Sequence, residues 1–172
     1  TNNNYNVFYF LLAFSNLRAL SFIGSADIVG SIITSVFWFF LASQLPPDEY
    51  GEIHYFIAIA MVASAFVIIA PQSSMIVFSA KKLKLESTFY FISLILTIIA
   101  SFVIMILFYK IDVVFLLFGY VLNILAIGQL LGRKLFSSYS KYHLSQKVLT
   151  ACLGLLFLQF YGSDGIILAL SL

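Results

Sequence analysis

Long apolar runs dominate the chain, and the basic residues fall in every second gap between them. A run of roughly 20 apolar residues has the length of a helix that crosses the hydrocarbon core of a bilayer. Because lipid offers no hydrogen-bond partners, a spanning segment must be a helix or a strand of a closed barrel, and barrel strands are shorter and alternate in polarity. The continuous runs therefore predict five transmembrane helices: Ile23–Leu45, Ile53–Ala80, Phe89–Phe108, Val113–Leu131 and Val148–Tyr161.

The composition excludes a soluble globular domain. Hydrophobic residues make up 62% of the chain and charged residues 9%, whereas a soluble domain is about half apolar and about a quarter charged. We expect a multi-pass protein of the plasma membrane that is in contact with lipid. Nucleic acid is not an expected partner, because the net charge of +2 is spread over the loops and forms no basic patch with interleaved aromatic residues.

The positions of the basic residues predict the orientation of the helices. All of them except Lys110 lie before the first run, between the second and third, or between the fourth and fifth. These residues are Arg18, Lys81, Lys82, Lys84, Arg133, Lys134, Lys141 and Lys147. Basic loops stay on the cytoplasmic side during insertion. The pattern therefore places the N-terminus of the chain in the cytoplasm and Lys110 on the outer side.

The two ends of the chain do not fit a full span. Tyr5–Phe22 is apolar, but it contains Arg18, which would cost about 3 kcal/mol at the bilayer centre. We therefore expect an interfacial N-terminal segment over residues 1–22 and a transmembrane lobe over residues 23–172. Ile166–Leu172 is too short to span and reads as the start of a sixth helix. The predicted fold class is an all-α polytopic membrane helix bundle.

The first span carries a stripe of polar residues on one side. The stripe consists of Asp27, Ser31, Thr34 and Trp38. Steps of four, three and four bring these residues to one face of a helix. The opposite face holds Ile28, Ile32, Phe39 and Phe40. The stripe is therefore predicted to point away from lipid, into the bundle.

Other polar residues within the spans are further candidates for a lining. Asn123 lies on one face of the fourth span with Tyr120, and Gln72 follows Pro71, which interrupts the second span. Polar residues beside a membrane proline either re-satisfy the freed backbone groups or line a cavity. Asp27 is a functional candidate as an intramembrane carboxylate, although it is near enough to the cytoplasmic end to reach the interface or to pair with Arg18.

The acidic and imidazole side chains indicate neither an enzyme nor a metal site. His54 and His143 have no neighbours at metal-ligand spacing, and we expect both to be interfacial polar residues. The close acidic cluster around Asp48 and Glu49 falls at the start of a helix, where the helix dipole favours carboxylates. No nucleophile or phosphate-loop motif occurs. We therefore expect no catalytic residues, no metal and no cofactor.

The stretch from residue 24 to residue 82 resembles a known transporter family. The first span ends in LASQLPPDEYG, Leu41–Gly51, and the second ends in APQSSMIVFSAKK. A motif of the form L-A-x-x-L-x-P-x-E-Y-G is typical of polysaccharide-biosynthesis flippases of the multidrug/oligosaccharidyl-lipid/polysaccharide exporter superfamily. These proteins transport lipid-linked O-antigen, capsule and related glycans. The Ser140-Lys141-Tyr142 neighbourhood is also similar to the basic linker before the fifth helix of that family.

This resemblance implies a mechanism and a set of site residues. Two helical lobes would enclose a cavity that opens alternately to either side, so the chain would be most of an N-terminal lobe, a fragment that pairs with a C-terminal lobe of the same protein. The implied substrate is a polyprenyl-pyrophosphate-linked glycan, with Arg133 and Lys134 as candidates for holding the pyrophosphate. Anchoring against anionic lipid explains these two residues equally well. The candidates for the cavity lining are Asp27, Ser31, Thr34, Trp38, Gln72 and Asn123.

One departure from the family pattern and two other functions stay open. Relatives often carry a basic residue where this chain has Phe78, so its role is absent here or has moved. A multidrug/cation antiporter of the same superfamily usually places coupling carboxylates deeper in the lobe than Asp27. A small non-transporting membrane subunit would instead pack against a partner through its Ala, Ser and Gly faces, and its reading frame would lack the further helices that a flippase needs.

Overall fold

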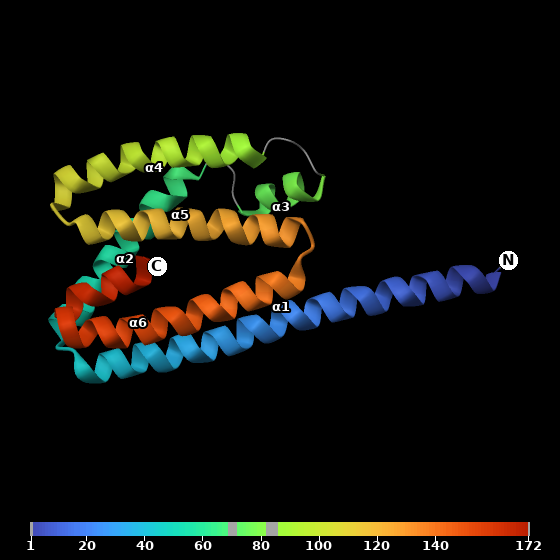
Figure 1. Ribbon diagram of the computed structural model, residues 1–172, viewed down its shortest axis with the longest axis horizontal. Helices are drawn as coiled ribbons and strands as arrows, with labels where there is room; N and C mark the ends of the chain where they lie inside the picture. Colours follow the sequence, from blue (N-terminus) through green and yellow to red (C-terminus); the bar gives the residue numbers. More distant parts are fainter. Residues whose placement is uncertain (1, 69–71, 82–85, 172) are drawn as a thin grey trace.

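The described part of the chain is a bundle of helices. The computed structural model describes the backbone of residues 2–68, 72–81 and 86–171, and the side chains of 2–20, 72, 74 and 86 lie outside the described residues. The helices are α1 (Asn2–Gln44), α2 (Pro47–Val67), α3 (Gln72–Ala80), α4 (Glu86–Phe108), α5 (Ile111–Gly132) and α6 (Phe136–Ser171). Figure 1 shows α1, α4, α5 and α6 running along roughly one direction, with α2 crossing them at an angle.

Five helical segments are long and apolar enough to cross a membrane. They are Ser21–Gln44, Pro47–Val67, Ser87–Phe108, Ile111–Gly132 and Phe136–Ser171 within the described residues. The prediction of an all-α polytopic membrane bundle with five spans is confirmed. Short connections join consecutive antiparallel helices, as Pro46-Pro47 does between α1 and α2, because proline cannot continue the first helix but fits the start of the next.

Helix α5 forms the centre of the bundle. It packs against α2, α3, α4 and α6, while α1 packs along α6 (Figure 1). Five of its apolar side chains are almost fully buried: Val113, Leu116, Leu117, Val121 and Leu125. The small polar side chains of α4, Ser93, Thr97 and Ser101, are also buried, and two of them donate hydrogen bonds to carbonyls of their own helix. Their small side chains allow α4 to pack closely against its neighbours.

The second predicted span differs from the structure at its start and in its middle. It begins earlier than predicted, at Pro47, so Asp48 and Glu49 lie in its first turn as expected. Instead of a kinked helix over Ile53–Ala80, the chain forms two helices, because Ile68 leaves the helix with φ −83° and ψ 95°. The predicted kink at Pro71 lies outside the described residues.

The last predicted span also begins much earlier than expected. The sequence predicts a span over Val148–Tyr161, whereas α6 begins at Phe136 and includes Lys141, His143 and Lys147. A prediction based on hydropathy alone leaves polar and charged residues such as these outside a span. Polar and ionisable side chains are tolerated within the membrane where they face the bundle interior, which is the case for His143 and Lys147.

Helix α6 reverses its direction near its end. Gly162 has φ 66° and ψ −145°, a conformation that glycine adopts at little steric cost. The segment after it folds back against α6 and α5 (Figure 1), with Ile166 and Ile167 buried. A Cβ at Gly165 would lie 2.5 Å from the carbonyl oxygen of Phe157. The close packing of this segment against the preceding part of α6 therefore also needs a glycine at position 165. The predicted start of a sixth helix is therefore helical and packs in the bundle.

The N-terminal segment continues the first span without a break. Helix α1 runs from Asn2 to Gln44, and its first part extends beyond the rest of the bundle (Figure 1). No helix boundary separates the segment 1–22 from the span that follows. The interfacial position of this segment and the division at residue 23 stay predictions.

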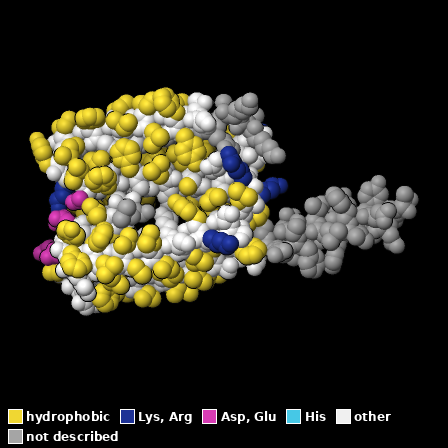
Figure 2. All heavy atoms as spheres, in the orientation of Figure 1, with side chains coloured by type: hydrophobic (Ala, Val, Ile, Leu, Met, Phe, Trp, Pro, Cys, Tyr) yellow, Lys and Arg dark blue, Asp and Glu magenta, His cyan; other side chains and the backbone are white. Residues whose placement is uncertain are grey.

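The two ends of the bundle differ in charge. Figure 2 shows acidic side chains at one end and most of the visible basic side chains at the other. At the acidic end, Lys110 in the connection between α4 and α5 lies 3.0 Å from Oε1 of Glu52 and 3.0 Å from Oδ1 of Asp164. Most of the basic side chains visible in Figure 2 thus lie at one end of the bundle, and which end faces the cytoplasm stays a prediction.

Candidate functional site

Two adjoining pockets lie between α1, α5 and α6. The first, here called the Trp38 pocket, has a volume of about 370 Å³ and is bordered by Thr34, Trp38, His54, Asn123, Tyr142 and Lys147, among others. The second, here called the Asp27 pocket, has a volume of about 460 Å³. Its lining consists of Asp27, Ser31, Thr34, Ser35, His143 and Lys147. Thr34 and Lys147 border both pockets, so the two lie next to each other along α1 and α6, and they are called the cavity below.

The polar stripe of the first span faces this cavity. Asp27, Ser31 and Thr34 border the Asp27 pocket, and Thr34 and Trp38 border the Trp38 pocket. On the other face of α1, the side chains are outward: Ile28 is 64% exposed, Ile32 58% and Phe39 78%. The stripe therefore borders the two pockets, but Asp27 and Ser31 are exposed, and the residues of α1 that are buried in the bundle are Ala26, Gly30, Phe37 and Leu41.

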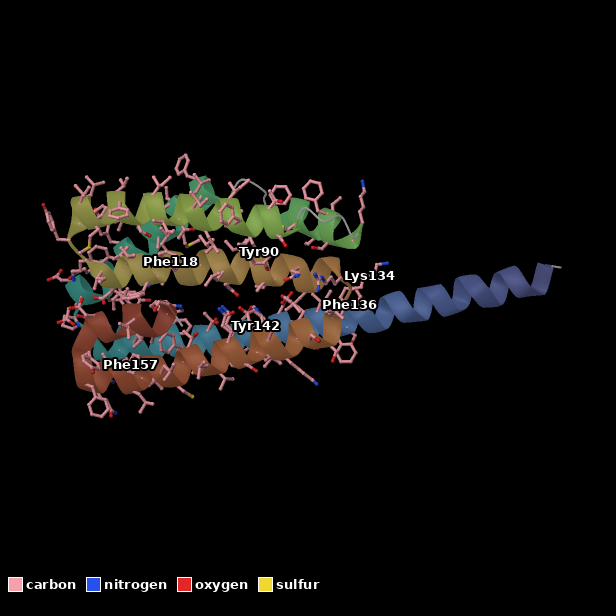
Figure 3. The ribbon with its side chains drawn as sticks, turned by 45° about the horizontal axis from the view of Figure 1, so that its top comes forward. Tyr90, Phe118, Lys134, Phe136, Tyr142 and Phe157 are labelled. Carbon is pink, nitrogen blue, oxygen red and sulfur yellow. The ribbon has the colours of Figure 1, made fainter. Side chains whose placement is uncertain are left out.

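The remaining predicted residues fall into three groups. Asn123 on α5 borders the Trp38 pocket, as expected for a lining residue. The side chain of Gln72 lies outside the described residues. Arg133 and Lys134 are exposed at the connection between α5 and α6, where Figure 3 shows Lys134 at the end of the bundle. The structure thus does not bring these two basic residues to the cavity.

Asp27 is held by residues of α6. The hydroxyl of Tyr139 donates a hydrogen bond to Oδ1 of Asp27 over 2.7 Å, and Nε2 of His143 lies 3.8 Å from the same oxygen. The rings of Tyr139 and His143 stack with their centroids 5.5 Å apart. The predicted alternative partner, Arg18, has a side chain outside the described residues. His143 packs against α1 through Asp27 and Gly30, and its predicted interfacial position stays a prediction.

Gly30 allows this close approach of α1 and α6. A Cβ at this position would lie 3.0 Å from Nε2 of His143 and 3.4 Å from Cγ of Lys147. Any larger residue would push α6 away from the polar stripe. Small residues are common where membrane helices pack closely, because they let the backbones approach.

Lys147 is the main residue of the cavity that the sequence did not reveal. It lies about three turns, or about 16 Å, from the start of α6, roughly half of a hydrocarbon core about 30 Å thick. The sequence offered a signal, since Tyr139, His143 and Lys147 follow one another at steps of four, as the stripe of α1 does. The pattern of basic residues assigns Lys147 only to a basic loop on the cytoplasmic side.

The Trp38 pocket has an aromatic wall and a polar wall. Trp38 contacts His54 at 4.5 Å between ring centroids, and Phe37 and Tyr50 at 5.4 Å and 6.0 Å in edge-to-face geometry. Across the pocket, the hydroxyl of Tyr142 donates a hydrogen bond to Oδ1 of Asn123 over 3.0 Å. Figure 3 shows Tyr142 on the side of α6 that faces α5.

The Trp38 pocket is suited to binding by hydrogen bonds, ring contacts and positive charge. Among the described residues that border the Trp38 pocket, Lys147 is a cation and none is a carboxylate. Over the described part of the chain, no group of three His, Cys, Asp or Glu residues is placed to hold a metal ion. The hydroxyl of Thr34 donates to the carbonyl of Gly30 over 2.8 Å, so it acts as a structural group within α1.

Comparison with known proteins found no match among protein-family models, curated proteins or solved structures. The resemblance carried by Leu41–Gly51 is therefore a basis for a proposal only.

Proposed function

We propose that this chain is the N-terminal lobe of a transporter that flips a lipid-linked oligosaccharide across the cytoplasmic membrane by alternating access, for the synthesis of cell-surface polysaccharide. One observation carries the proposal: a bundle of membrane-spanning helices contains a polar cavity bordered by Asp27, Thr34 and Asn123 and by Lys147. A membrane protein with only a structural role has no need to keep such a cavity open between its helices.

A glycan needs this kind of environment to cross a bilayer. Moving a hydroxyl group into hydrocarbon without a hydrogen-bond partner costs several kcal/mol, and an oligosaccharide carries many hydroxyls. The cavity offers amide, hydroxyl and phenol groups from Asn123, Thr150 and Tyr142. The outward faces of the helices carry exposed apolar side chains such as Phe102 and Ile106, along which a polyprenyl tail would stay in lipid.

Lys147 is the residue that we assign to the anionic part of the substrate. It borders both pockets, whereas Arg133 and Lys134 lie at the end of the bundle. Hydrogen bonds between charged partners are roughly twice as strong as those between neutral ones. In this proposal, Arg133 and Lys134 bind the pyrophosphate at the cytoplasmic surface, and Lys147 binds it within the cavity. Lys147 would then take the role of the basic residue that relatives carry at the position of Phe78.

A cation antiporter is the second candidate, and Asp27 is the observation in its favour. The carboxylate lies within a membrane-spanning segment and contacts Tyr139 and His143, and such a group is a default candidate for ion or proton coupling. The positive charge of Lys147 in the Trp38 pocket argues against a cationic substrate, because it would repel a cation. We therefore favour the glycan as the substrate.

The test is transport by the full-length protein in proteoliposomes. A fluorescent lipid-linked oligosaccharide is placed in one leaflet, and its appearance in the other is measured with a membrane-impermeant quencher. We expect transport by the wild type and a loss of about tenfold or more in Lys147→Gln, the size of a lost charged hydrogen bond of roughly 1.5–3 kcal/mol. Lys141→Gln, also on α6 but exposed, is the matched control and should transport normally.

Two results would contradict the proposal. The first is wild-type protein that is folded in the vesicles and moves no glycan-lipid. The second is exchange of an organic cation for protons or sodium by the same vesicles, with loss of exchange in Asp27→Asn, which would establish the antiporter instead.

A further inference from the structure

We propose that Trp38 is the platform of a saccharide subsite, on which one neutral or acidic sugar ring stacks while its hydroxyl groups bond to the wall formed by Asn123 and Tyr142. This inference rests on the proposed function and names the residues that would distinguish the glycan from its lipid carrier. It follows from three features of the Trp38 pocket: a fixed aromatic ring, an opposing polar wall and the sign of the charge.

The indole of Trp38 is fixed by its neighbours. Phe37 and Tyr50 meet it edge to face, at centroid distances of 5.4 Å and 6.0 Å, and the ring of His54 lies 4.5 Å away at an angle of 35°. Trp38 is only partly buried and borders the pocket. A ring that is already ordered loses little conformational entropy when a ligand binds to it, so it can act as a rigid surface.

A sugar ring has an apolar side and a polar rim, and the pocket offers a surface for each. Its C–H groups can pack on the flat indole, which supplies a large apolar area. The polar rim would meet the amide of Asn123 and the hydroxyl of Tyr142, which are joined at 3.0 Å, and the amide of Gln146. The volume of about 370 Å³ falls within the range of roughly 300–1,000 Å³ of small-molecule sites.

The charge of the pocket decides between a sugar and an organic cation. Aromatic rings such as Trp38 and Tyr50 also bind quaternary ammonium groups, and a site for these usually adds a carboxylate. The described residues bordering the Trp38 pocket include none, and Lys147 supplies a positive charge. A cation on Trp38 would be repelled, whereas a neutral sugar would be accepted and an acidic sugar or glycosyl phosphate attracted.

The experiment compares two lipids on the full-length protein in detergent. One probe is a short-chain polyprenyl diphosphate that carries a single hexose, and the other is the same polyprenyl diphosphate without sugar. Binding is measured by calorimetry. We expect the hexose to strengthen binding about tenfold. The fluorescence of Trp38 is obtained as the difference in emission between wild type and Trp38→Phe. This fluorescence should change with the hexose probe and not with the sugar-free lipid.

Three variants separate stacking from folding. Trp38→Leu should reduce binding of the hexose probe about tenfold and leave binding of the sugar-free lipid unchanged. Trp38→Phe should retain most of the gain in affinity from the hexose, because phenylalanine keeps a flat ring. Phe39→Leu, on the exposed face of the same helix, is the matched control and should behave as wild type. Binding of the sugar-free lipid shows that each variant is folded.

The outcomes distinguish the subsite from the function. Equal binding of the two probes, or an unchanged hexose effect in Trp38→Leu, would overturn the saccharide subsite while the lipid-linked substrate still stands. Binding of neither probe by folded wild-type protein would overturn both. Quenching of Trp38 by tetraethylammonium, with no response to the hexose probe, would show a cation site in place of the sugar site.

Discussion

The hydroxyl of Tyr139 on α6 donates a hydrogen bond to Oδ1 of Asp27 on α1 over 2.7 Å. The two residues are far apart in the sequence, and their contact joins the polar face of the last helix to the polar stripe of the first. Tyr139 is 6% exposed, whereas the side chain of Asp27 is 50% exposed toward the cavity. The bond therefore holds a carboxylate in place at the edge of a cavity while one side of it stays accessible.

The first prediction separates the structural role of this bond from a transport role. Tyr139→Phe should lower the free energy of unfolding by about 1–2 kcal/mol, the size of a hydrogen bond to a charged and partly exposed group. Asp27→Asn keeps an oxygen that can accept the bond, so its stability should stay near wild type while glycan export falls. Thermal unfolding in detergent and complementation of a flippase-null strain at equal expression measure the two effects.

Tyr161→Phe, which is exposed on the same helix, is the control for removal of a phenol hydroxyl. Normal export by Asp27→Asn at wild-type expression would remove Asp27 from the site. An unchanged melting temperature in Tyr139→Phe would show that the bond adds nothing measurable to stability.

The stripe of α1 that borders the two pockets could be recognised in the sequence because its spacing lies within one helix. Asp27 and Trp38 stand out from an apolar background at helical spacing, and lipid allows such residues only toward the interior. The boundary between α1 and α2 was equally local, since Pro46 and Pro47 determine it through backbone chemistry alone.

The start of α6 and the role of Lys147 could not be read from hydropathy in the same way. A lysine near a membrane interface anchors a loop, whereas a lysine within a bundle lines a cavity. Its hydropathy value is the same in both positions, so hydropathy cannot distinguish the two roles. What places Lys147 in the second class is the polar stripe of another helix, packed against it through Gly30. The sequence shows each stripe but not that the two meet.

The second prediction concerns Gly154 of α6. A Cβ there would lie 2.6 Å from Cζ of Phe37, and Phe37 is itself 6% exposed and has little room to move. Gly154→Ala should therefore destabilise the protein by about 1–3 kcal/mol through overpacking. The same substitution at Gly51, where nothing lies within 4 Å, should be neutral or stabilise the exposed helix by up to about 1 kcal/mol.

Thermal unfolding of both glycine variants in detergent checks this prediction. If Gly154→Ala melts at or above the temperature of Gly51→Ala, the close packing of α6 on α1 at Phe37 is wrong.

The third prediction tests the backbone at the end of α5. Lys134 has φ 58°; its amide donates to the carbonyl of Leu131 over 3.0 Å, and the amide of Leu135 donates to that of Leu130 over 2.9 Å. This pair of bonds ends helices at a left-handed residue, which is most often glycine. Lys134→Gly should therefore stabilise the protein by about 1 kcal/mol, because a side chain disfavours this conformation.

Lys134→Ala is the matched control, since it removes the same charge but keeps a Cβ, and it should give no gain in melting temperature. The pair also tests the predicted contact of Lys134 with pyrophosphate. If that contact exists, both variants lose transport to the same extent, although only one of them is stabilised.

The fourth prediction uses the cluster at the acidic end of the bundle. Lys110 bonds to Glu52 of α2 and to Asp164 in the reversal of α6, each at 3.0 Å, and lies 5.0 Å from the ring centre of Phe56. It thereby ties three segments together. Because its side chain is 30% exposed, solvent weakens each ion pair to less than about 1 kcal/mol, and Lys110→Met should lower the free energy of unfolding by about 1 kcal/mol in total.

The pH dependence of this loss follows from the direction of the pKa shift. Burial lowers the pKa of Lys110, but the hydrogen bonds to Asp164 and Glu52 outweigh burial, so its pKa lies above the usual 10.5. The folded state thus holds this proton more tightly than the unfolded chain does, so its stabilising effect is complete below pH 10.5 and is lost as the pH rises through the folded pKa. Melting temperatures of wild type and Lys110→Met, measured from about pH 9 to about pH 12, should converge at the alkaline end. A difference that stays constant over this range would mean that Lys110 acts through packing on Phe56 and not through its charge.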